Sequence, residues 1–373
     1  MHISKRGDIS RKQAWAIRIG AILIALIICG IVTTLTTGLD PLGVYGTMFN
    51  GAFGSERKIW VLFKELSLLL VVSLGLTPAF KMKFWNLGGE GQIMIGALTT
   101  AAIMIYLGNT RPGPILILLM LIGAVGAGAI WAMIPAFFKA RWNTNETLFT
   151  LMMNYVAIQL TAYFIIIWEV PKGSGKVGII NQSSMNGWLP VIAHKQYLLV
   201  IVMAVIVTAA MHVYLKYSKH GYEISVVGES QNTARYVGIK VDKVIIRTLI
   251  LSGGICGLVG WMMVSGTDHT ITTTLSGGMG FLGVMVAWLA QFNPVAMVLS
   301  SLLLAFLSRG ASEISAIYQL NHSFGDIITG IIIFFIIGSE FFINYKINIG
   351  KKDAEETAGD ADAEDRKEGS DNV

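Results

Sequence analysis

The polar residues that could do chemistry in this chain interrupt long apolar runs. The stretch from Asn86 to Gln92, Asn-Leu-Gly-Gly-Glu-Gly-Gln, holds three glycines and sets the carboxylate of Glu90 beside apolar sequence. Glycine permits backbone conformations that a continuous helix forbids. A charged group near the centre of a membrane helix costs about 2.5–3.5 kcal/mol, so it needs a protein or water partner. The stretch predicts a polar break that opens toward a cargo path, or else a soluble loop between helices.

A second polar group follows further along the chain. Glu146, Thr150 and Asn154 recur at intervals of four residues, directly after Asn145, so a helix would place them on one face. In lipid such a face must meet protein or water. Hydrogen bonding between helices, worth about 0.6 kcal/mol on average, is enough to explain the threonine. For Asn154 we expect instead a place along a cargo path.

The two groups follow turns of similar composition. The segment from Phe80 to Asn86 resembles the segment from Phe138 to Asn143, and a glutamate follows each. Basic and aromatic residues are common at membrane interfaces, so the likeness has a plain explanation. The alternative is that two related hairpins deliver polar groups to a shared centre, as repeats in transporters do. The candidate pathway residues, with one asparagine before a later proline, are Asn86, Glu90, Gln92, Asn145, Glu146, Thr150, Asn154 and Asn293.

The inner loop from Lys216 to Lys243 carries a short helix signal. Ser230 is a good N-cap, Gln231 to Val237 can form two helical turns, and Gly238 is a good stop. A short capped helix of mixed character suits docking into a groove of a cytoplasmic partner. A helix lying on the membrane surface would carry more basic and more apolar residues. The candidate coupling residues are Gly228, Glu229, Ser230, Ala234, Arg235, Tyr236 and Gly238.

Composition places the elements that hold these residues in a membrane. Hydrophobic residues make up 54% and charged residues 14% of the 373 residues, and the mean hydropathy is +0.63. Because about 20 apolar residues cross a bilayer, we predict an all-α polytopic protein with about ten spans. The last-but-one apolar run, Gly278 to Ser308, should split at Asn293-Pro294 into two shorter helices. The other predicted spans are residues 19–38, 59–80, 87–107, 114–138, 147–168, 197–215, 244–264 and 326–343.

Basic residues predict the orientation. Five of them precede the first apolar run, which lacks a small-residue cleavage site and therefore predicts a retained helix that starts in the cytoplasm. If the chain is followed through its spans from that start, 18 Lys and Arg fall on inner flanks, leaving out Arg366 and Lys367 of the tail, and eight fall outside. We expect a cytoplasmic N-terminus over residues 1–18 and a transmembrane domain over 19–345 with its inner loop at 216–243. A cytoplasmic acidic tail over 346–373 should be disordered.

Several functional classes find little support. Cys29 and Cys256 lie in apolar runs, which argues against a disulfide framework or a metal site. The segment from Gly173 to Lys176 lacks the spacing of a phosphate-binding loop, so we expect neither nucleotide hydrolysis nor a cofactor. The basic excess reflects membrane orientation rather than nucleic-acid binding. An ion-coupled secondary transporter would need paired buried carboxylates, and those available are Glu65, Glu90, Glu146 and Asp326.

Three motifs in order resemble a known family. Asn86 to Gln92, Asn145 to Tyr155 and Gly228 to Ile239 are similar to motifs of the permease subunits of bacterial nucleoside-type ABC importers. These belong to the branched-chain amino acid and ribose permease superfamily, and the likeness spans about residues 15–345. It implies a type II importer fold in the bacterial cell membrane and nucleosides as cargo, with a simple sugar such as ribose as the alternative.

The resemblance also implies partners. They are a homologous permease forming a heterodimer, a cytoplasmic ATP-binding subunit and an external substrate-binding lipoprotein. The segment from Gly228 to Ile239 would be the coupling helix. The chain departs from the family at Ser230-Gln231, where Asn-Pro is common, and at Leu282, which replaces a frequently polar residue.

Overall fold

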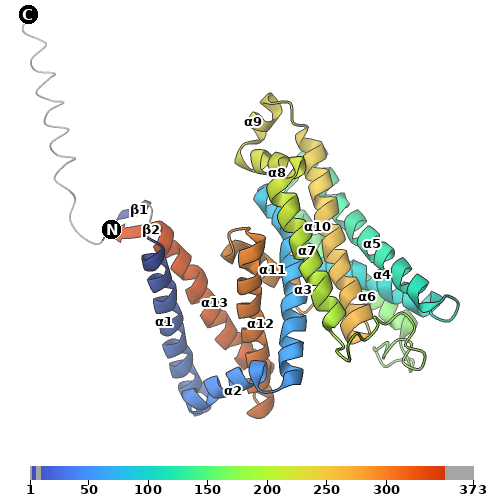
Figure 1. Ribbon diagram of the computed structural model, residues 1–373, viewed down its shortest axis with the longest axis horizontal. Helices are drawn as coiled ribbons and strands as arrows, with labels where there is room; N and C mark the ends of the chain where they lie inside the picture. The colour runs from blue at the N-terminus through green and yellow to red at the C-terminus, as the bar shows by residue number, and fades with distance from the viewer. Residues whose placement is uncertain (1, 6–9, 349–373) are drawn as a thin grey trace, which may run out of the picture. The chain divides into compact units, whose positions relative to one another are not determined.

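A computed structural model of the chain describes residues 2–5 and 10–348 (Figure 1). Within these residues nine helices are long and apolar enough to cross a membrane, which confirms the predicted polytopic α-helical class. The chain divides into two compact units, one of residues 45–325 and one formed by the segments before and after it. Most of the predicted acidic tail lies outside the described residues.

The smaller unit pairs the first and last described segments of the chain. It contains β1 (His2–Lys5), α1 (Arg11–Thr37), most of α13 (His322–Asn344) and β2 (Tyr345–Asn348). The two strands are antiparallel, with His2 opposite Asn348. Nothing in the sequence pattern predicted this strand pair.

The larger unit holds the remaining helices. They are α2 (Pro41–Phe53), which begins in the smaller unit, α3 (Glu56–Lys81), α4 (Gly89–Leu107), α5 (Gly113–Trp142), α6 (Glu146–Trp168), α7 (Leu198–Tyr217), α8 (Lys219–Glu229), α9 (Gln231–Tyr236), α10 (Val241–Met263), the π-helical turn η1 (Val264–Asp268), α11 (Met279–Leu289) and α12 (Pro294–Ile317). Helices α3, α4 and α10 are the most buried spans. Helices α5, α6 and α7 leave apolar faces exposed, as lipid contact requires.

Close approach of glycines brings the central helices together. A Cβ at Gly257 of α10 would lie 2.3 Å from the Ala124 carbonyl oxygen of α5, and one at Gly260 would lie 2.3 Å from the Ile93 carbonyl oxygen of α4. Real Cβ atoms are not found at such distances, so only glycine fits. Small residues permit this packing where lipid supplies no hydrophobic force between helices.

The split at Asn293-Pro294 is confirmed, but the two helices differ from the prediction. Helix α11 has 11 residues, too few to cross the bilayer, whereas α12 continues to Ile317 and has 24. The predicted helix ended with the apolar run at Ser308, before the charged residues Arg309 and Glu313. In the structure each forms an ion pair with α3, which lets the helix continue.

Helices α8 and α9 lie at one end of the larger unit. Helix α8, which the sequence pattern missed, follows α7 and leads into α9 (Figure 1). A Cβ at Gly228 of α8 would lie 2.2 Å from the Lys81 carbonyl oxygen, so α8 rests against the C-terminus of α3. Helix α9 and the turn between α3 and α4 are therefore at the same end.

Candidate functional site

The break before α4 is held by side chains from α6. The Thr150 hydroxyl oxygen accepts a hydrogen bond from the Leu87 amide at 3.2 Å. The Asn154 side chain donates to the Leu87 carbonyl at 2.8 Å and accepts from the Gly91 amide at 2.8 Å. Both side chains are buried. They satisfy backbone groups that the interrupted helix leaves free, which is what irregular backbone at membrane depth requires.

Asn86 links this turn to α4 and α10. Its side-chain oxygen accepts from the Gly88 amide at 3.0 Å and from the Gln92 side-chain nitrogen at 3.2 Å. Its nitrogen donates to the Ser252 hydroxyl on α10 at 3.1 Å. We call Asn86, Gln92, Thr150 and Asn154 the polar network. The Gln92 side-chain oxygen is buried and has no partner in the described part of the chain.

Glu90 is engaged with the start of α11. Its carboxylate accepts from the Gly278 amide at 2.9 Å, the Gly280 amide at 2.8 Å and the Ser276 hydroxyl. The Glu90 side chain is buried. The carboxylate also lies in the first turn of α4. Since helix N-termini carry partial positive charge, one buried anion serves two helix starts.

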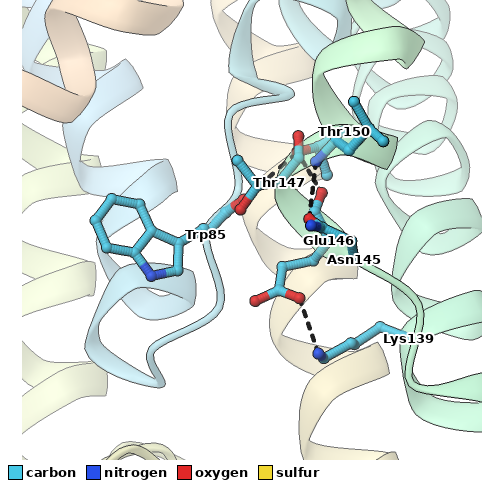
Figure 2. Close-up of polar contacts among 7 residues, drawn as sticks. Trp85, Lys139, Asn145, Glu146, Thr147 and Thr150 are labelled. Carbon is cyan, nitrogen blue, oxygen red and sulfur yellow. Dashed lines mark hydrogen bonds and ion pairs between the residues drawn. The ribbon is translucent and has the colours of Figure 1, made fainter.

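Figure 2 shows that the candidates at the start of α6 have local roles. The Asn145 side chain accepts from the Leu148 amide at 3.1 Å and caps the helix. The Glu146 carboxylate pairs with Lys139 at 2.8 Å, while its carbonyl oxygen accepts from the Thr150 hydroxyl at 2.7 Å. Thus the side chains of Asn145 and Glu146 lie beside the polar network without joining it.

Asn293 also lies outside the network. Its side chain accepts from the Val295 amide at 3.0 Å and caps α12, and the residue is exposed. The start of α6 nevertheless contacts the turn between α3 and α4, because Thr150 and Asn154 form hydrogen bonds with Leu87 and Gly91. Whether any of these side chains touches cargo stays a prediction.

Helix α9 has the caps that the sequence predicts. The Ser230 hydroxyl accepts from the Thr233 amide at 3.2 Å, and Gly238 has a positive φ of 82°. Ala234 is fully buried in an apolar cluster with residues of α3, α8 and α10. Tyr236 is 92% exposed, and Arg235 and Glu229 are exposed as well. The helix is anchored on one side and presents polar and aromatic side chains on the other.

Three features escaped sequence reasoning. His269 stacks on Trp188 with ring centroids 3.7 Å apart, and its burial lowers its pKa. Glu65 pairs with Arg309, and Lys58 pairs with Glu313, across α3 and α12. The spacing of the charges, seven residues on α3 and four on α12, is the signal that could have revealed these ion pairs. No group of three potential metal ligands occurs among residues 2–5 and 10–348.

Comparison with known proteins identifies relatives. Residues 61–337 match the family model for the branched-chain amino acid transport system permease component. The guanosine ABC transporter permease protein NupP of Bacillus subtilis (strain 168) is 31% identical over 324 residues, covering 85% of this chain and 92% of NupP. The glucose ABC transporter permease protein TsgB13 of Haloferax volcanii is 27% identical. The match covers 97% of this chain and 98% of the length of TsgB13.

A further relative has similar coverage. The nucleoside ABC transporter permease protein NupB of Lactococcus lactis subsp. cremoris is 25% identical. The match covers 84% of this chain and 89% of the length of NupB. No solved structure matches the chain significantly.

Proposed function

Because this chain belongs to the family of permease components of branched-chain amino acid transport systems, we propose that it forms the cargo pathway of an ATP-driven importer of nucleosides. The coarser statement follows from the family and its relatives: the chain is a multi-pass permease of a cell-membrane ABC transporter and is not the catalytic subunit. Such a permease works with an ATP-binding subunit and a second permease.

The observation that carries the proposal is the mounting of α9. Gly228 allows α8 to rest on the end of α3, and Ala234 anchors α9 in the apolar cluster. The exposed side chains of Arg235 and Tyr236 are free to enter a groove on the ATP-binding subunit. Movement of that subunit would reach the spans through a short, rigid connection.

During transport, the parts of the permease that change conformation would be its two irregular segments. The turn before α4 and the start of α11 depend on side-chain hydrogen bonds rather than on continuous helix. Interrupted segments of this kind lie at the cargo sites of many transporters, where access alternates between the two sides. The polar network lies near the α9 end, so we place it on the cytoplasmic half of the pathway.

Nucleosides are the proposed cargo, and a simple sugar is the second candidate. Two of the relatives described above are named for guanosine and nucleosides, and NupP has the highest identity of the three. The glucose permease TsgB13 covers more of this chain, which favours a sugar. An external binding lipoprotein would deliver either cargo, and the second permease would be a different chain.

The experiment that tests cargo and partners is purification of the intact complex through this chain. Mass spectrometry should identify an ATP-binding subunit, a second permease and a lipidated binding protein. Calorimetric titration of that binding protein should show tight binding of a nucleoside and none of glucose or ribose. Tight binding of a sugar alone would move the assignment to the second candidate.

A charge reversal tests the coupling role. Arg235→Glu should abolish uptake while leaving membrane insertion and the yield of the permease unchanged, because the altered side chain is exposed. Arg141→Glu is the matched control, since Arg141 is also exposed and lies in the last turn of α5. Normal uptake by the Arg235 variant would contradict the coupling assignment.

A further inference from the structure

An ion pair joins α8 to α10 near the α9 end of the larger unit. Arg247 Nη2 of α10 lies 2.7 Å from Glu223 Oε2 of α8. The Glu223 side chain is 16% exposed and the Arg247 side chain 35% exposed, so salt screens this pair less than a pair on the open surface. Since α9 separates α8 from α10 in the chain, the pair links two helices that are not consecutive.

Helices α8 and α9 form one compact piece. Ser230 ends α8 and caps the start of α9, so no flexible linker separates the two helices. Ile224 and Val227 of α8 and Ala234 of α9 are buried in the same apolar cluster. A force applied to the exposed face of α9 should therefore move α8 together with α9.

The chain connection between α9 and α10 provides one point of attachment. It consists of residues 237–240, and α10 begins directly afterwards at Val241. Arg247 lies six residues further, about 9 Å along the helix. One attachment leaves the angle between two helices adjustable, and apolar packing has no preferred direction. The ion pair adds a second attachment, so it fixes how α10 is oriented on α8.

Helix α10 leads from the ion pair to the polar network. Ser252 follows Arg247 by five residues, and its hydroxyl accepts a hydrogen bond from the Asn86 side-chain nitrogen at 3.1 Å. Ser252 and Asn86 are both fully buried. Asn86 in turn holds the Gly88 amide and the Gln92 side chain. The contacts thus continue from α9 through α8 and α10 to the turn before α4.

We propose that the Glu223–Arg247 pair fastens α10 to α8 and α9, so that movement of α9 shifts α10 and rearranges the turn before α4 through Ser252 and Asn86. Glu223 and Arg247 are positioning residues, because they act through the contacts of other residues. The inference rests on the proposed function for the movement of α9. It adds the route by which that movement reaches the polar network.

The number of cargo molecules moved per ATP hydrolysed measures this role in proteoliposomes that contain the complete complex. With Glu223→Gln or Arg247→Gln, ATP hydrolysis should stay close to that of the unaltered complex, because the exposed face of α9 is unchanged. Cargo moved per ATP should fall about threefold or more, within the range that substitutions along a coupling route cause. A loss of folded complex alone would lower both rates together and leave their ratio unchanged.

Exchange of the two charges tests the pair itself. Glu223→Arg and Arg247→Glu each bring like charges together, so each should lower the cargo moved per ATP more than the Gln forms do. The double variant restores opposite charges and should recover most of the loss, which a double-mutant cycle expresses as a coupling between the two positions. Independent effects of the two substitutions would overturn the inference.

The Lys58–Glu313 pair supplies the matched control. It joins α3 to α12 at the same distance of 2.7 Å, and its side chains are 32% and 19% exposed. Lys58 lies near the start of α3, away from the end against which α8 rests. Lys58→Gln and Glu313→Gln should therefore leave the cargo moved per ATP unchanged. A fall equal to that of the Glu223 variant would overturn the inference, because any ion pair between helices would then have the same effect.

A smaller change covers the case in which the charge variants fail to fold. Ser252→Ala keeps the ion pair and loses the hydrogen bond from Asn86, so it should also lower the cargo moved per ATP. An unchanged ratio in this variant would overturn the route. Arg235→Glu separates the route from the proposed function. If that variant abolishes uptake while the Glu223 and Ser252 variants keep the normal ratio, only the route is wrong, whereas normal uptake by the Arg235 variant would overturn both.

Discussion

Replacement of Glu90 by alanine is the perturbation with the clearest structural magnitude. The carboxylate accepts the Gly278 and Gly280 amides at 2.9 and 2.8 Å in a buried site. Each buried amide left without an acceptor costs about 1–3 kcal/mol, so Glu90→Ala should cost about 2–6 kcal/mol. Every 1.4 kcal/mol is a factor of ten in an equilibrium. We therefore expect the correct placement of α11 to become at least about tenfold less favourable.

Uptake into proteoliposomes and the thermal unfolding midpoint of the purified complex measure the effect. Glu90→Ala should lower both, and Glu90→Gln should lower them less, because its amide retains one acceptor oxygen. Glu56→Ala is the matched control, since Glu56 also lies in the first turn of a long helix but is exposed. A Glu90→Ala complex that transports and unfolds like the unaltered one would refute the assigned role of this carboxylate.

Three further predictions follow from single contacts. Asn154→Leu should cut uptake at least about tenfold, because it breaks two buried hydrogen bonds to the turn before α4, whereas Thr161→Val, which loses only a bond within its own helix, should not. Gly228→Val should lower the yield of folded complex because the added atoms meet the end of α3, while Gly126→Ala, which has open space, should express normally. Hydrogen bonds from two backbone amides lower the pKa of Glu169 below its ordinary value of 4.5. Its loop should therefore stay protected from hydrogen exchange above pH 4.5 and lose protection as the pH falls through that lowered pKa, and Glu169→Gln should exchange faster at neutral pH.

Local features of the fold were predictable from the sequence. Spans follow from the apolar length that a bilayer demands, which is a property of each segment alone. Helix α9 was predictable because Ser230 and Gly238 act on neighbouring backbone groups. The likeness of the two turns raised the meeting of the hairpins as one of two alternatives, and the contacts of Thr150 and Asn154 agree with it.

Long-range pairing was not predictable. The partners of Glu90 are residues of the α11 start, nearly 190 positions away, and no local pattern joins them. The length of α12 was missed for the same reason, because its charges are tolerated only through their partners on α3. Helix α8 escaped because its mixed composition lacks the length of a span. Sequence reasoning thus found the polar residues but not which of them fasten the fold.

Site-specific cross-linking from Tyr236 tests the central claim most directly. A photoreactive group at this 92% exposed position, in the assembled complex, should capture the ATP-binding subunit. The yield of that cross-link should change when ATP is added, because the account makes α9 the element through which the spans are moved. Capture of the external binding protein, or labelling of the position by an impermeant reagent added outside intact cells, would contradict it.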